Sequence, residues 1–303
     1  MTETRLRAAL VQTKPAKGQY ARNLAETGAA FAQLAADPPD LIVLPEAALT
    51  GYFLEGAVYE LALSAAQFAH DLAAAWRAAS GGRAVDIAAG FFENDGGTFY
   101  NSAVYLHVEG GEERIVHLHR KMFLPTYGVF DEERFLSRGR KLGVFATRFG
   151  PMAILICEDA CHAIVPALAA IKGARILIVP SASPGRGIET EGTGELESIV
   201  HWRETLKLAA REHGVFVLYA GLTGFEGGKG MSGSSCVVDP RGRVLIEAPP
   251  AQAAIVRADL DLREIDRARA SFPLLGDLGA ALPDLLLDDE LPLPRGSRDV
   301  RGR

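Results

Sequence analysis

The 303-residue sequence contains only three cysteines, Cys157, Cys161 and Cys236. Three cysteines are too few for a disulfide framework and their number is odd, so we expect a reducing, cytoplasmic setting. Long apolar runs are also missing. Nothing approaches the roughly 18 apolar residues of a membrane span, and the N-terminal stretch MTETRLRAALVQ has no apolar segment of signal-peptide length. The sequence therefore predicts a protein without a membrane partner.

A basic excess is missing as well. The 32 Lys and Arg residues are outnumbered by 38 Asp and Glu residues, which gives a formal net charge of -6. Proteins that bind nucleic acids usually carry clustered positive charge, so we expect no nucleic-acid partner. The contents of hydrophobic residues (48%) and charged residues (23%) are ordinary for a globular protein, and 303 residues can bury a sizeable core.

Short apolar runs alternate with longer amphipathic segments along most of the chain. Residues 5–12 (RLRAALVQ) have the pattern of a strand, and residues 20–37 have that of an Ala-rich helix that stops at two prolines. Helical spacing returns at 57–79 and at 195–213. Because the alternation continues without a linker-like break, we predict an α/β fold with one domain over residues 1–270.

Three segments differ from this pattern. Residues 184–197 and the glycine-rich segment 221–233 lack periodicity, and we expect both to be mobile loops. Residues 271–303 are rich in Leu, Pro and charge, and they form a C-terminal tail. We expect the part LPDLLLDDE to pack on a partner subunit and the end, PRGSRDVRGR, to be disordered.

Three apolar strands lead to a residue that can take part in chemistry. Glu46 follows LIVLP, Lys121 lies in VHLHRKMFLP, and Cys157 follows AILI. Sites in α/β proteins are usually built at strand ends, because a rigid strand fixes the side chain while loops surround it. Each residue also has a simpler interpretation: a buried structural cysteine, a glutamate that begins a helix, and a solvated lysine at a strand edge.

Taken together, these three side chains form a complete set for acyl transfer. Cysteine is a good nucleophile once a nearby base takes its proton, and glutamate can act as that base. Lysine can stabilise the oxyanion, aided by a backbone N–H that follows the nucleophile. The combination of Glu46, Lys121 and Cys157 thus favours a thiol-dependent hydrolase.

Three blocks around these residues resemble the signature blocks of the nitrilase, or carbon–nitrogen hydrolase, superfamily. They are LIVLPEAALTGY at 41–52, HRKMFLPTYGVFDEERFLSRG at 119–139 and AILICEDACH at 153–162. Further segments, such as GARILIVPSASP and GSSCVVDPRGRVL, extend the resemblance over residues 5–270. The resemblance implies an α/β fold of the four-layer αββα sandwich type, commonly assembled as a homodimer. It also implies that neither a metal nor an organic cofactor is needed.

The resemblance also implies roles for single residues. By position in the blocks, Glu46 matches the general base, Cys157 the nucleophile and Lys121 the group that stabilises the tetrahedral intermediate. A second glutamate of the superfamily falls on Glu132, and Glu133, one residue later, is the competing assignment. Both glutamates also fit the charged, solvent-facing start of a helix.

The residues after the nucleophile have two interpretations. One groups Cys157, Cys161 and His162 as a metal site, although a lone C-x3-C-H pattern lacks the ligand number and spacing of known zinc sites. The other places Cys161 and His162 on the pocket floor or at a helix cap.

Asn101, in YNSA, is expected to fix a hairpin near Glu46 rather than to touch substrate. Packing or a local hydrogen bond explains each candidate for substrate contact equally well: Tyr52, Tyr127, Glu158, His162, Ser181 and Trp202.

The positions next to the cysteine also bear on the substrate. Nitrilases proper usually have a tryptophan there, whereas the order Cys-Glu-Asp at 157–159 is more similar to amidase and glutaminase branches, including the glutaminase domains of glutamine-dependent NAD synthetases. Glu158 and Asp159 occupy positions that vary with substrate in the superfamily. Hydrolases of N-carbamoyl amino acids tend to carry arginines just past the cysteine, and residues 160–163 contain none.

The sequence therefore predicts a hydrolase of a small amide, such as an ω-amide or a glutamine-like compound. An N-carbamoyl-amide hydrolase and a nitrilase are the alternatives within the same chemistry. A non-catalytic scaffold of the same fold is the alternative from another class, and the intact Glu46, Lys121 and Cys157 argue against it.

Overall fold

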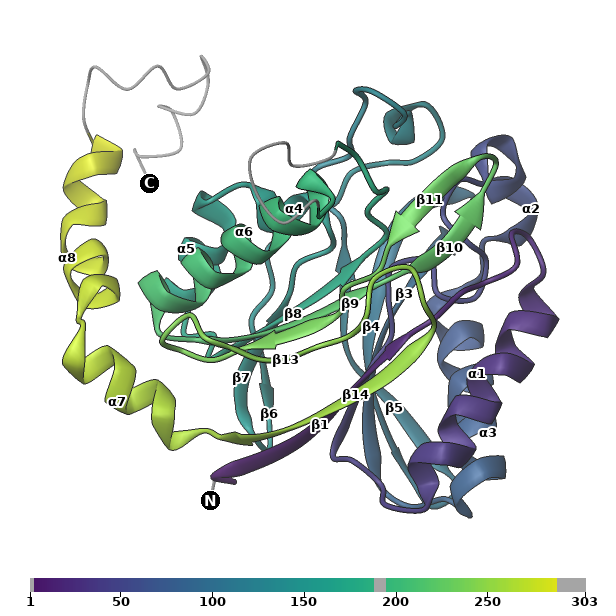
Figure 1. Ribbon diagram of the computed structural model, residues 1–303, viewed down its shortest axis with the longest axis horizontal. Helices are drawn as coiled ribbons and strands as arrows, with labels where there is room; N and C mark the ends of the chain where they lie inside the picture. Colours follow the sequence, from purple (N-terminus) through teal and green to yellow (C-terminus); the bar gives the residue numbers. More distant parts are fainter. Residues whose placement is uncertain (1–2, 188–194, 288–303) are drawn as a thin grey trace.

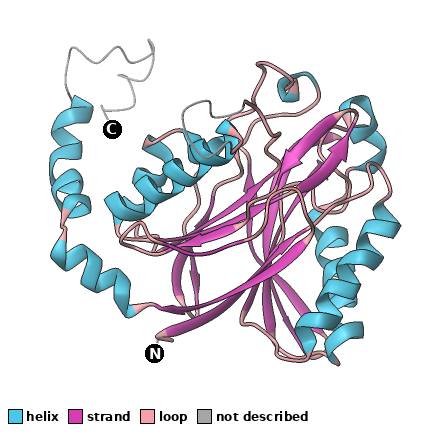
Figure 2. Cartoon of the chain, viewed as in Figure 1, coloured by secondary structure: helices cyan, strands magenta, loops and turns pink. Residues whose placement is uncertain are grey.

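The computed structural model describes residues 3–187 and 195–287 of the chain. Two six-stranded β-sheets pack face to face, and helices cover the outer face of each sheet (Figure 1). Figure 2 shows the strands gathered in the centre of the molecule and the helices on either side of them. This arrangement confirms the four-layer αββα sandwich that the sequence predicts.

The first sheet has the strand order β14-β1-β2-β3-β4-β5. Strands β1, β2 and β3 run parallel, while β4, β5 and β14 are antiparallel to their neighbours. β2 is short, and its three residues are apolar and buried. Strands that are covered on both faces of the sheet read as continuous apolar runs of this kind. The strands are β1 (Arg5–Gln12), β2 (Leu41–Val43), β3 (Val85–Asp95), β4 (Thr98–Glu109), β5 (Glu112–Arg120) and β14 (Ala254–Asp261).

The second sheet has the strand order β13-β12-β9-β8-β7-β6. Its central strands β7, β8 and β9 run parallel, and β6, β12 and β13 are antiparallel to their neighbours. Strands β12 and β13 form a hairpin that turns around Pro240. The strands are β6 (Phe145–Thr147), β7 (Gly150–Ile154), β8 (Ile176–Ser181), β9 (Phe216–Gly221), β12 (Cys236–Val238) and β13 (Val244–Glu247).

Helices α1 and α3 cover the first sheet, and α5 and α6 cover the second (Figure 1). The layer under α1 and α3 joins Phe31 and Trp76, whose rings meet edge to face at 5.7 Å, to strand residues such as Ile87. The layer between the sheets combines residues of both, such as Leu10 and Ile178. The covering helices are α1 (Tyr20–Ala35), α3 (Ala65–Ser80), α5 (Ile164–Ile171) and α6 (Glu197–His213).

The prediction of a single helix at 57–79 is wrong, because the structure divides this segment. A 3-10 turn η1 (Glu55–Ala57) and helix α2 (Val58–Leu61) come first, and the backbone is extended at Ala62 before α3 begins. Ser64 caps α3, since its side-chain oxygen accepts the N–H of Gln67 at 3.2 Å. The cap at Ser64 thus starts a new helix within a stretch whose apolar spacing is continuous.

The glycine-rich segment 221–233 is not the mobile loop that we expected. It contains a hairpin of strands β10 (Thr223–Glu226) and β11 (Lys229–Ser232), which pair antiparallel. Gly227 and Gly228 form the turn with φ of 57° and 81°, a left-handed conformation that glycine adopts at little cost. In the other expected loop, 184–197, residues 188–194 lie outside the described part of the chain.

The C-terminal tail begins as a helix. After α7 (Arg263–Ser271), helix α8 (Leu274–Leu287) contacts α5 and α6 along one side of the molecule (Figure 1). The expected disordered end, PRGSRDVRGR, lies outside the described residues. Within 3–187 and 195–287, no single helix is long and apolar enough to cross a membrane, and only the pair α7–α8, bent by 67°, reaches that length and composition.

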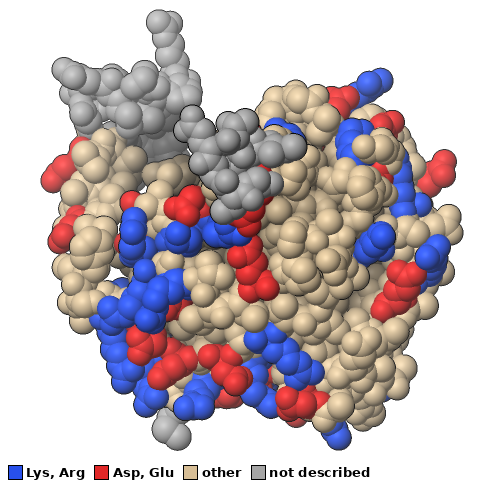
Figure 3. Space-filling view, viewed as in Figure 1, with Lys and Arg blue, Asp and Glu red and all other residues tan. Residues whose placement is uncertain are grey.

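Charges of both signs are interspersed on the face shown in Figure 3. Lys and Arg alternate with Asp and Glu over the lower part of this face, whereas its centre is occupied mainly by uncharged residues. Because neighbouring charges of opposite sign cancel at a distance, this part of the surface has no strong field of one sign.

Candidate active site

The ends of three strands bring Glu46, Lys121 and Cys157 together. Strands β2 and β5 of the first sheet lead to Glu46 and Lys121, and β7 of the second sheet leads to Cys157. Gly90 on β3 permits a close backbone approach, because a Cβ at this position would lie 2.5 Å from the Cα of Glu46. The site therefore lies where the two sheets meet, next to the short helix α4 (Figure 1).

Lys121 stands at the centre of a buried polar cluster. Its Nζ donates to Glu46 Oε1 at 2.8 Å and to Glu132 Oε1 at 2.7 Å, and the lysine side chain is fully buried. The same two carboxylate oxygens accept further hydrogen bonds, from Asn101 Nδ2 at 2.7 Å in the case of Glu46 and from the Tyr52 hydroxyl in the case of Glu132. One ammonium group thus holds both glutamates in place.

The charges of this cluster shift the pKa values of its members. Burial alone would lower the pKa of Lys121, but the carboxylates of Glu132 and Glu46 outweigh it and hold this pKa well above its usual range. Burial, together with the neighbouring charge of Glu46, raises the pKa of Glu132 to about 7, although Lys121 acts in the opposite direction. Burial thus makes Glu132 easier to protonate than a free carboxyl group, and the charge of Glu46 adds to this effect.

Cys157 lies at a sharp corner between β7 and α4 (Glu158–Cys161). Its φ of 45° and ψ of -104° are rarely adopted by a residue that has a Cβ atom. The N–H of Cys157 donates to the Pro180 carbonyl at 2.9 Å, so strand β8 holds the strained corner. Strain of this kind persists where the surrounding structure over-determines the backbone, and it occurs most often at functional sites.

The thiol of Cys157 is buried beside the carboxylate cluster. The Ser181 hydroxyl donates to Cys157 Sγ at 3.2 Å. Burial and the negative charge of Glu46 raise the thiol pKa well above its usual value, while Lys121 lowers it. The resting group is therefore a neutral thiol, which needs a base before it can attack a carbonyl, and the neighbouring Glu46 can act as that base.

The candidates for substrate contact fall into two groups. Tyr52 and Ser181 belong to the buried cluster. The Tyr52 hydroxyl donates to Glu132, and the Ser181 hydroxyl donates to the thiol. Tyr127, Glu158 and His162 lie nearer the surface. The half-exposed Tyr127 hydroxyl donates to Glu158 Oε2 at 2.8 Å, and His162 Nε2 lies 3.7 Å from Glu158 Oε1. These three side chains form a polar rim around α4.

Trp202 lies in the hydrophobic core rather than in the polar cluster. Its buried ring packs against the ring of Tyr219, with 5.0 Å between the centroids. Burial raises the pKa of Tyr219 well above its usual value, although the neighbouring Ser181 acts in the opposite direction. Trp202 therefore packs on Tyr219 in the core rather than among the polar side chains of the cluster.

The structure distinguishes the two competing glutamates. Glu132 is buried against Lys121, whereas Glu133 is exposed to solvent. Asn101 lies on β4 and binds Glu46, in line with its expected position near this glutamate.

Several residues of the site were not found by sequence reasoning. Tyr219 is one, and Glu226 of the β10–β11 hairpin is another. Glu226 Oε2 accepts the N–H groups of Tyr52 and Phe53 at 2.8 and 2.9 Å, so it fixes the loop that carries the Tyr52 hydroxyl. No sequence signal pointed to Glu226, because its partners are more than 170 residues away in the chain.

The alternative metal site receives no support from the geometry. The ring of His162 stacks on Phe123 at 3.9 Å and is directed toward Glu158 rather than toward Cys157. Over the described ranges, no group of three or more His, Cys, Asp or Glu side chains is arranged to hold a metal ion.

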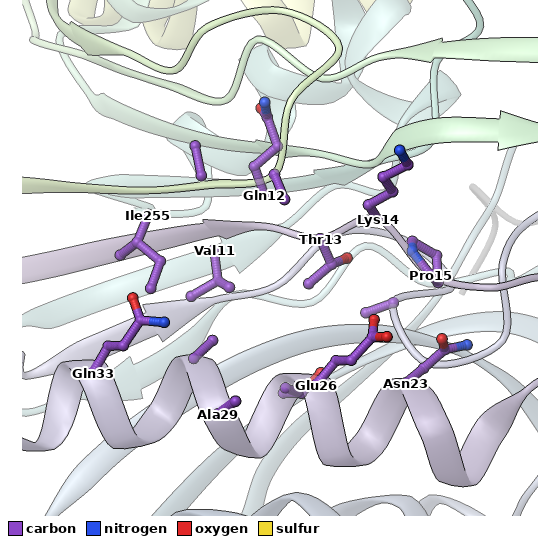
Figure 4. Close-up of a pocket in the computed structure, with 15 residues that line it drawn as sticks. Val11, Gln12, Thr13, Lys14, Pro15, Asn23, Glu26, Ala29, Gln33 and Ile255 are labelled. Atoms are coloured by element: carbon purple, nitrogen blue, oxygen red, sulfur yellow. The ribbon is translucent and has the colours of Figure 1, made fainter.

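Two cavities differ in their relation to this site. One of about 320 Å³ borders the polar cluster at Tyr52 and Glu132, and its walls are mostly apolar. A larger one of about 450 Å³ lies under α1, where Glu26 and Gln33 face Val11 (Figure 4). Neither the thiol nor the two carboxylates and lysine of the cluster line the larger cavity, so its size alone does not make it the reactive site.

Sequence comparisons place the chain among known proteins. A family model described as carbon-nitrogen hydrolase matches residues 7–270. A glutamine-dependent NAD(+) synthetase from Rhodobacter capsulatus is 31% identical over 263 residues, which cover 85% of this chain and 44% of that protein. A 2-oxoglutaramate amidase from Bacillus subtilis is 31% identical over 180 residues, which cover 59% of this chain and 64% of that protein. The chain thus spans less than half the length of the synthetase.

Solved structures share the fold. A carbon-nitrogen hydrolase from Helicobacter pylori G27 has a TM-score of 0.78 to this chain at 24% identity, with coverage of 94% of this chain and 99% of that chain. At this level of identity the likeness concerns the fold. The match of the family model over residues 7–270, in contrast, identifies the family. The chain belongs to the carbon-nitrogen hydrolase family.

Proposed function

We propose that this protein is a thiol-dependent hydrolase of a small amide. Cys157 is the nucleophile, Glu46 the general base and Lys121 the stabiliser of the oxyanion. The observation that carries the proposal is the buried Lys121 ammonium group, which bridges Glu46 and Glu132 beside the Cys157 thiol. A base, a cation and a nucleophile are thereby held in one water-poor cluster, which is the arrangement that acyl transfer needs.

In the first half-reaction, Glu46 takes the thiol proton while Cys157 Sγ attacks the amide carbonyl carbon. A C–S bond forms, and the electron pair of the carbonyl moves to its oxygen. Glu46 then gives the proton to the nitrogen, the C–N bond breaks, and ammonia or an amine leaves a thioester on Cys157.

Two hydrogen-bond donors stabilise the oxyanion that forms in this step. Two of the three N–H groups of Lys121 bind carboxylates, which leaves the third for the developing charge. The backbone N–H of Glu158, in the first turn of α4, has no helical partner and supplies the second hydrogen bond. Glu132 keeps Lys121 oriented, so that the positive charge is in place before the reaction begins.

In the second half-reaction, water attacks the thioester. Glu46 takes a proton from the water, the C–S bond breaks, and the proton passes to the departing Cys157 sulfur. The products are a carboxylic acid and the free enzyme.

The substrate class follows from three features. The order Cys-Glu-Asp at 157–159 resembles amidase and glutaminase branches rather than nitrilases. Two relatives carry names that include a linear ω-amide, 2-oxoglutaramate in one and glutamine in the other. The rim of Tyr127, Glu158 and His162 offers polar groups to the far end of such a molecule. We therefore propose an ω-amide or glutamine-like substrate.

Ammonia release from a panel of compounds tests this function. The panel contains glutamine, 2-oxoglutaramate, simple aliphatic amides, N-carbamoyl amino acids and nitriles. We expect turnover of at least one ω-amide by the wild type, loss of turnover in Cys157→Ala, and retained turnover in the matched control Cys161→Ala. Turnover of a carbamoyl compound or a nitrile alone would move the assignment to that class. Equal turnover by Cys157→Ala and the wild type would refute the thiol mechanism.

We also propose that the protein acts in the cytoplasm as a homodimer. All three cysteines are free thiols, which suits a reducing compartment. Helix α8 lies against α5 and α6 and exposes Leu274, Leu285 and Leu287, and a second subunit would bury these leucines. Light scattering on the purified chain measures the assembly directly, and a monomer mass at micromolar concentration would refute the dimer.

A further inference from the structure

The side chain of Asp159 is buried between the two sheets instead of facing the substrate rim. Its Oδ1 accepts the backbone N–H groups of Met122 at 2.9 Å and Phe123 at 3.0 Å, the two residues that follow Lys121. Asp159 occupies a position that varies with substrate in the superfamily, yet its side chain is directed away from the rim. The reason is that α4 turns Glu158 outward to the rim and Asp159 inward.

The second oxygen of the same carboxylate binds the other half of the site. Asp159 Oδ2 accepts the backbone N–H of Ile156, the residue before Cys157, at 3.1 Å. It also accepts a hydrogen bond from Nε2 of His119, at 2.8 Å. Both side chains, those of His119 and Asp159, are 0% exposed. One carboxylate thus receives four donors from the chain segments on either side of the site.

These bonds connect the two sheets at the point where their reactive residues emerge. His119 lies on β5 of the first sheet, which leads to Lys121, and Ile156 follows β7 of the second sheet, which leads to Cys157. A buried carboxylate is costly to leave without partners, so neither segment can move away from it independently. The distance between the Lys121 ammonium group and the Cys157 sulfur is accordingly coupled to Asp159.

We propose that Asp159 and His119 form a positioning pair that sets Lys121 relative to Cys157 during amide hydrolysis. This inference rests on the proposed function, because it assigns to Lys121 the stabilisation of the oxyanion. Asp159 does not touch the reacting atoms: it acts through the backbone of residues 122–123 and 156. A displaced Lys121 still permits substrate to bind at the rim, but it no longer meets the oxyanion. The pair therefore contributes to kcat much more than to KM.

Four variants test the pair. Asp159→Asn retains the shape but turns an NH₂ group toward N–H donors of the chain. His119→Leu removes one donor, whereas His119→Gln keeps an N–H close to the position of the imidazole Nε2. His117→Leu is the matched control, since His117 lies on the same face of β5, stacks on Phe145 and has no bond to Asp159.

The expected results differ between kcat and KM. Because misplacement by about 1 Å can cost about 100-fold in rate, we expect Asp159→Asn to lower kcat by about 100-fold and His119→Leu by about 10-fold. We expect KM to change by less than about threefold, and kcat of His119→Gln and His117→Leu to stay within about threefold of the wild type. Thermal melting of each variant shows whether the protein measured is folded.

A second measurement does not depend on amide turnover. The rate at which iodoacetamide alkylates Cys157, followed by peptide mass spectrometry, reports the geometry of the thiol and its neighbours. We expect slower labelling in Asp159→Asn and His119→Leu than in His117→Leu, with His119→Gln close to the wild type.

The possible outcomes distinguish a failure of the positioning pair from a failure of the proposed function. If the wild type hydrolyses amides but folded Asp159→Asn or His119→Leu keeps wild-type kcat, the positioning pair is refuted and the proposed function stands. A rise in KM at unchanged kcat likewise refutes the pair. If Asp159→Asn does not fold, the comparison of His119→Leu with His119→Gln decides. If the wild type turns over no amide, the proposed function fails, and the labelling rates alone support or refute the coupling of Asp159 to Cys157.

Discussion

Replacing Lys121 by methionine removes the ammonium group from between Glu46 and Glu132. Methionine is unbranched and of similar length, so it fills the space without adding a polar atom. Two buried carboxylates then face each other without the cation that binds both, since Lys121 Nζ lies 2.8 Å from Glu46 Oε1 and 2.7 Å from Glu132 Oε1. The variant therefore tests the electrostatic description of the site as well as the reaction.

The size of the effect follows from the burial of all three groups. Breaking a buried ion pair by removing one partner costs about 3–5 kcal/mol, because the remaining charge stays buried without compensation. A domain is stabilised by only about 5–15 kcal/mol in total, so this loss is large but measurable. Lys121 holds down the pKa of Glu132, and its removal raises that pKa further. We therefore expect the loss to be greater at pH 8 than at pH 6, because a group whose pKa is raised by folding destabilises the folded state increasingly as the pH rises.

Urea unfolding at both pH values measures this loss. The double variant Lys121→Met/Glu132→Gln removes one of the two negative charges left by the loss of the lysine. We expect it to regain about 2 kcal/mol of stability relative to Lys121→Met. It should not regain amide hydrolysis, because the oxyanion donor is still absent. Lys207→Met is the matched control: its lysine pairs with Glu204 at the surface, and such pairs contribute about 0–1 kcal/mol.

Two results would contradict this reasoning. A loss below about 1 kcal/mol in Lys121→Met at pH 8 would mean that the cluster does not depend on its cation, since exposed pairs already reach that value. Amide turnover close to that of the wild type in folded Lys121→Met would remove Lys121 from the reaction.

Three further predictions concern the same cluster. Burial raises the pKa of Glu132 from 4.5 to about 7, so its contribution to stability is complete below pH 4.5 and is lost as the pH rises through about 7. The stability difference between the wild type and Glu132→Gln should therefore shrink between pH 5 and 8, by at most about 3 kcal/mol in urea unfolding, and a growing difference would contradict the assigned shift. Tyr52→Phe removes a hydrogen bond that lowers the Glu132 pKa, and the acidic limb of the pH–rate profile should move to higher pH if it reflects Glu132. Glu226→Leu leaves two buried N–H groups without an acceptor and should lower the free energy of unfolding by about 1–3 kcal/mol, whereas Glu226→Gln should retain most of it.

Much of the fold was predictable because local patterns and global packing agree. The apolar run at 5–12 is β1, and the amphipathic segment 20–37 contains α1. The errors occurred where a helix cap or a glycine turn, rather than the spacing of apolar residues, decides the local structure. Ser64 starts α3 within a continuous helical pattern, and two glycines turn an apparent loop into the β10–β11 hairpin.

The site was predictable in part for a related reason. Glu46, Lys121 and Cys157 each follow an apolar strand, and this position can be read from the sequence together with the family blocks around it. The sequence distinguishes Glu132 from Glu133 less well, because adjacent residues differ only in the direction of the side chain, which depends on contacts with Lys121.

The sequence by itself determined the candidate reactive side chains and their position at strand ends, because residue type and periodicity are local properties, and its resemblance to the superfamily implied the four-layer fold. The tertiary structure decided how these residues affect one another. Only the packing of two sheets places the Lys121 ammonium group between two carboxylates, turns Asp159 inward and buries the thiol. Protonation and alignment depend on distances between segments far apart in the chain, and such distances exist only once the protein has folded.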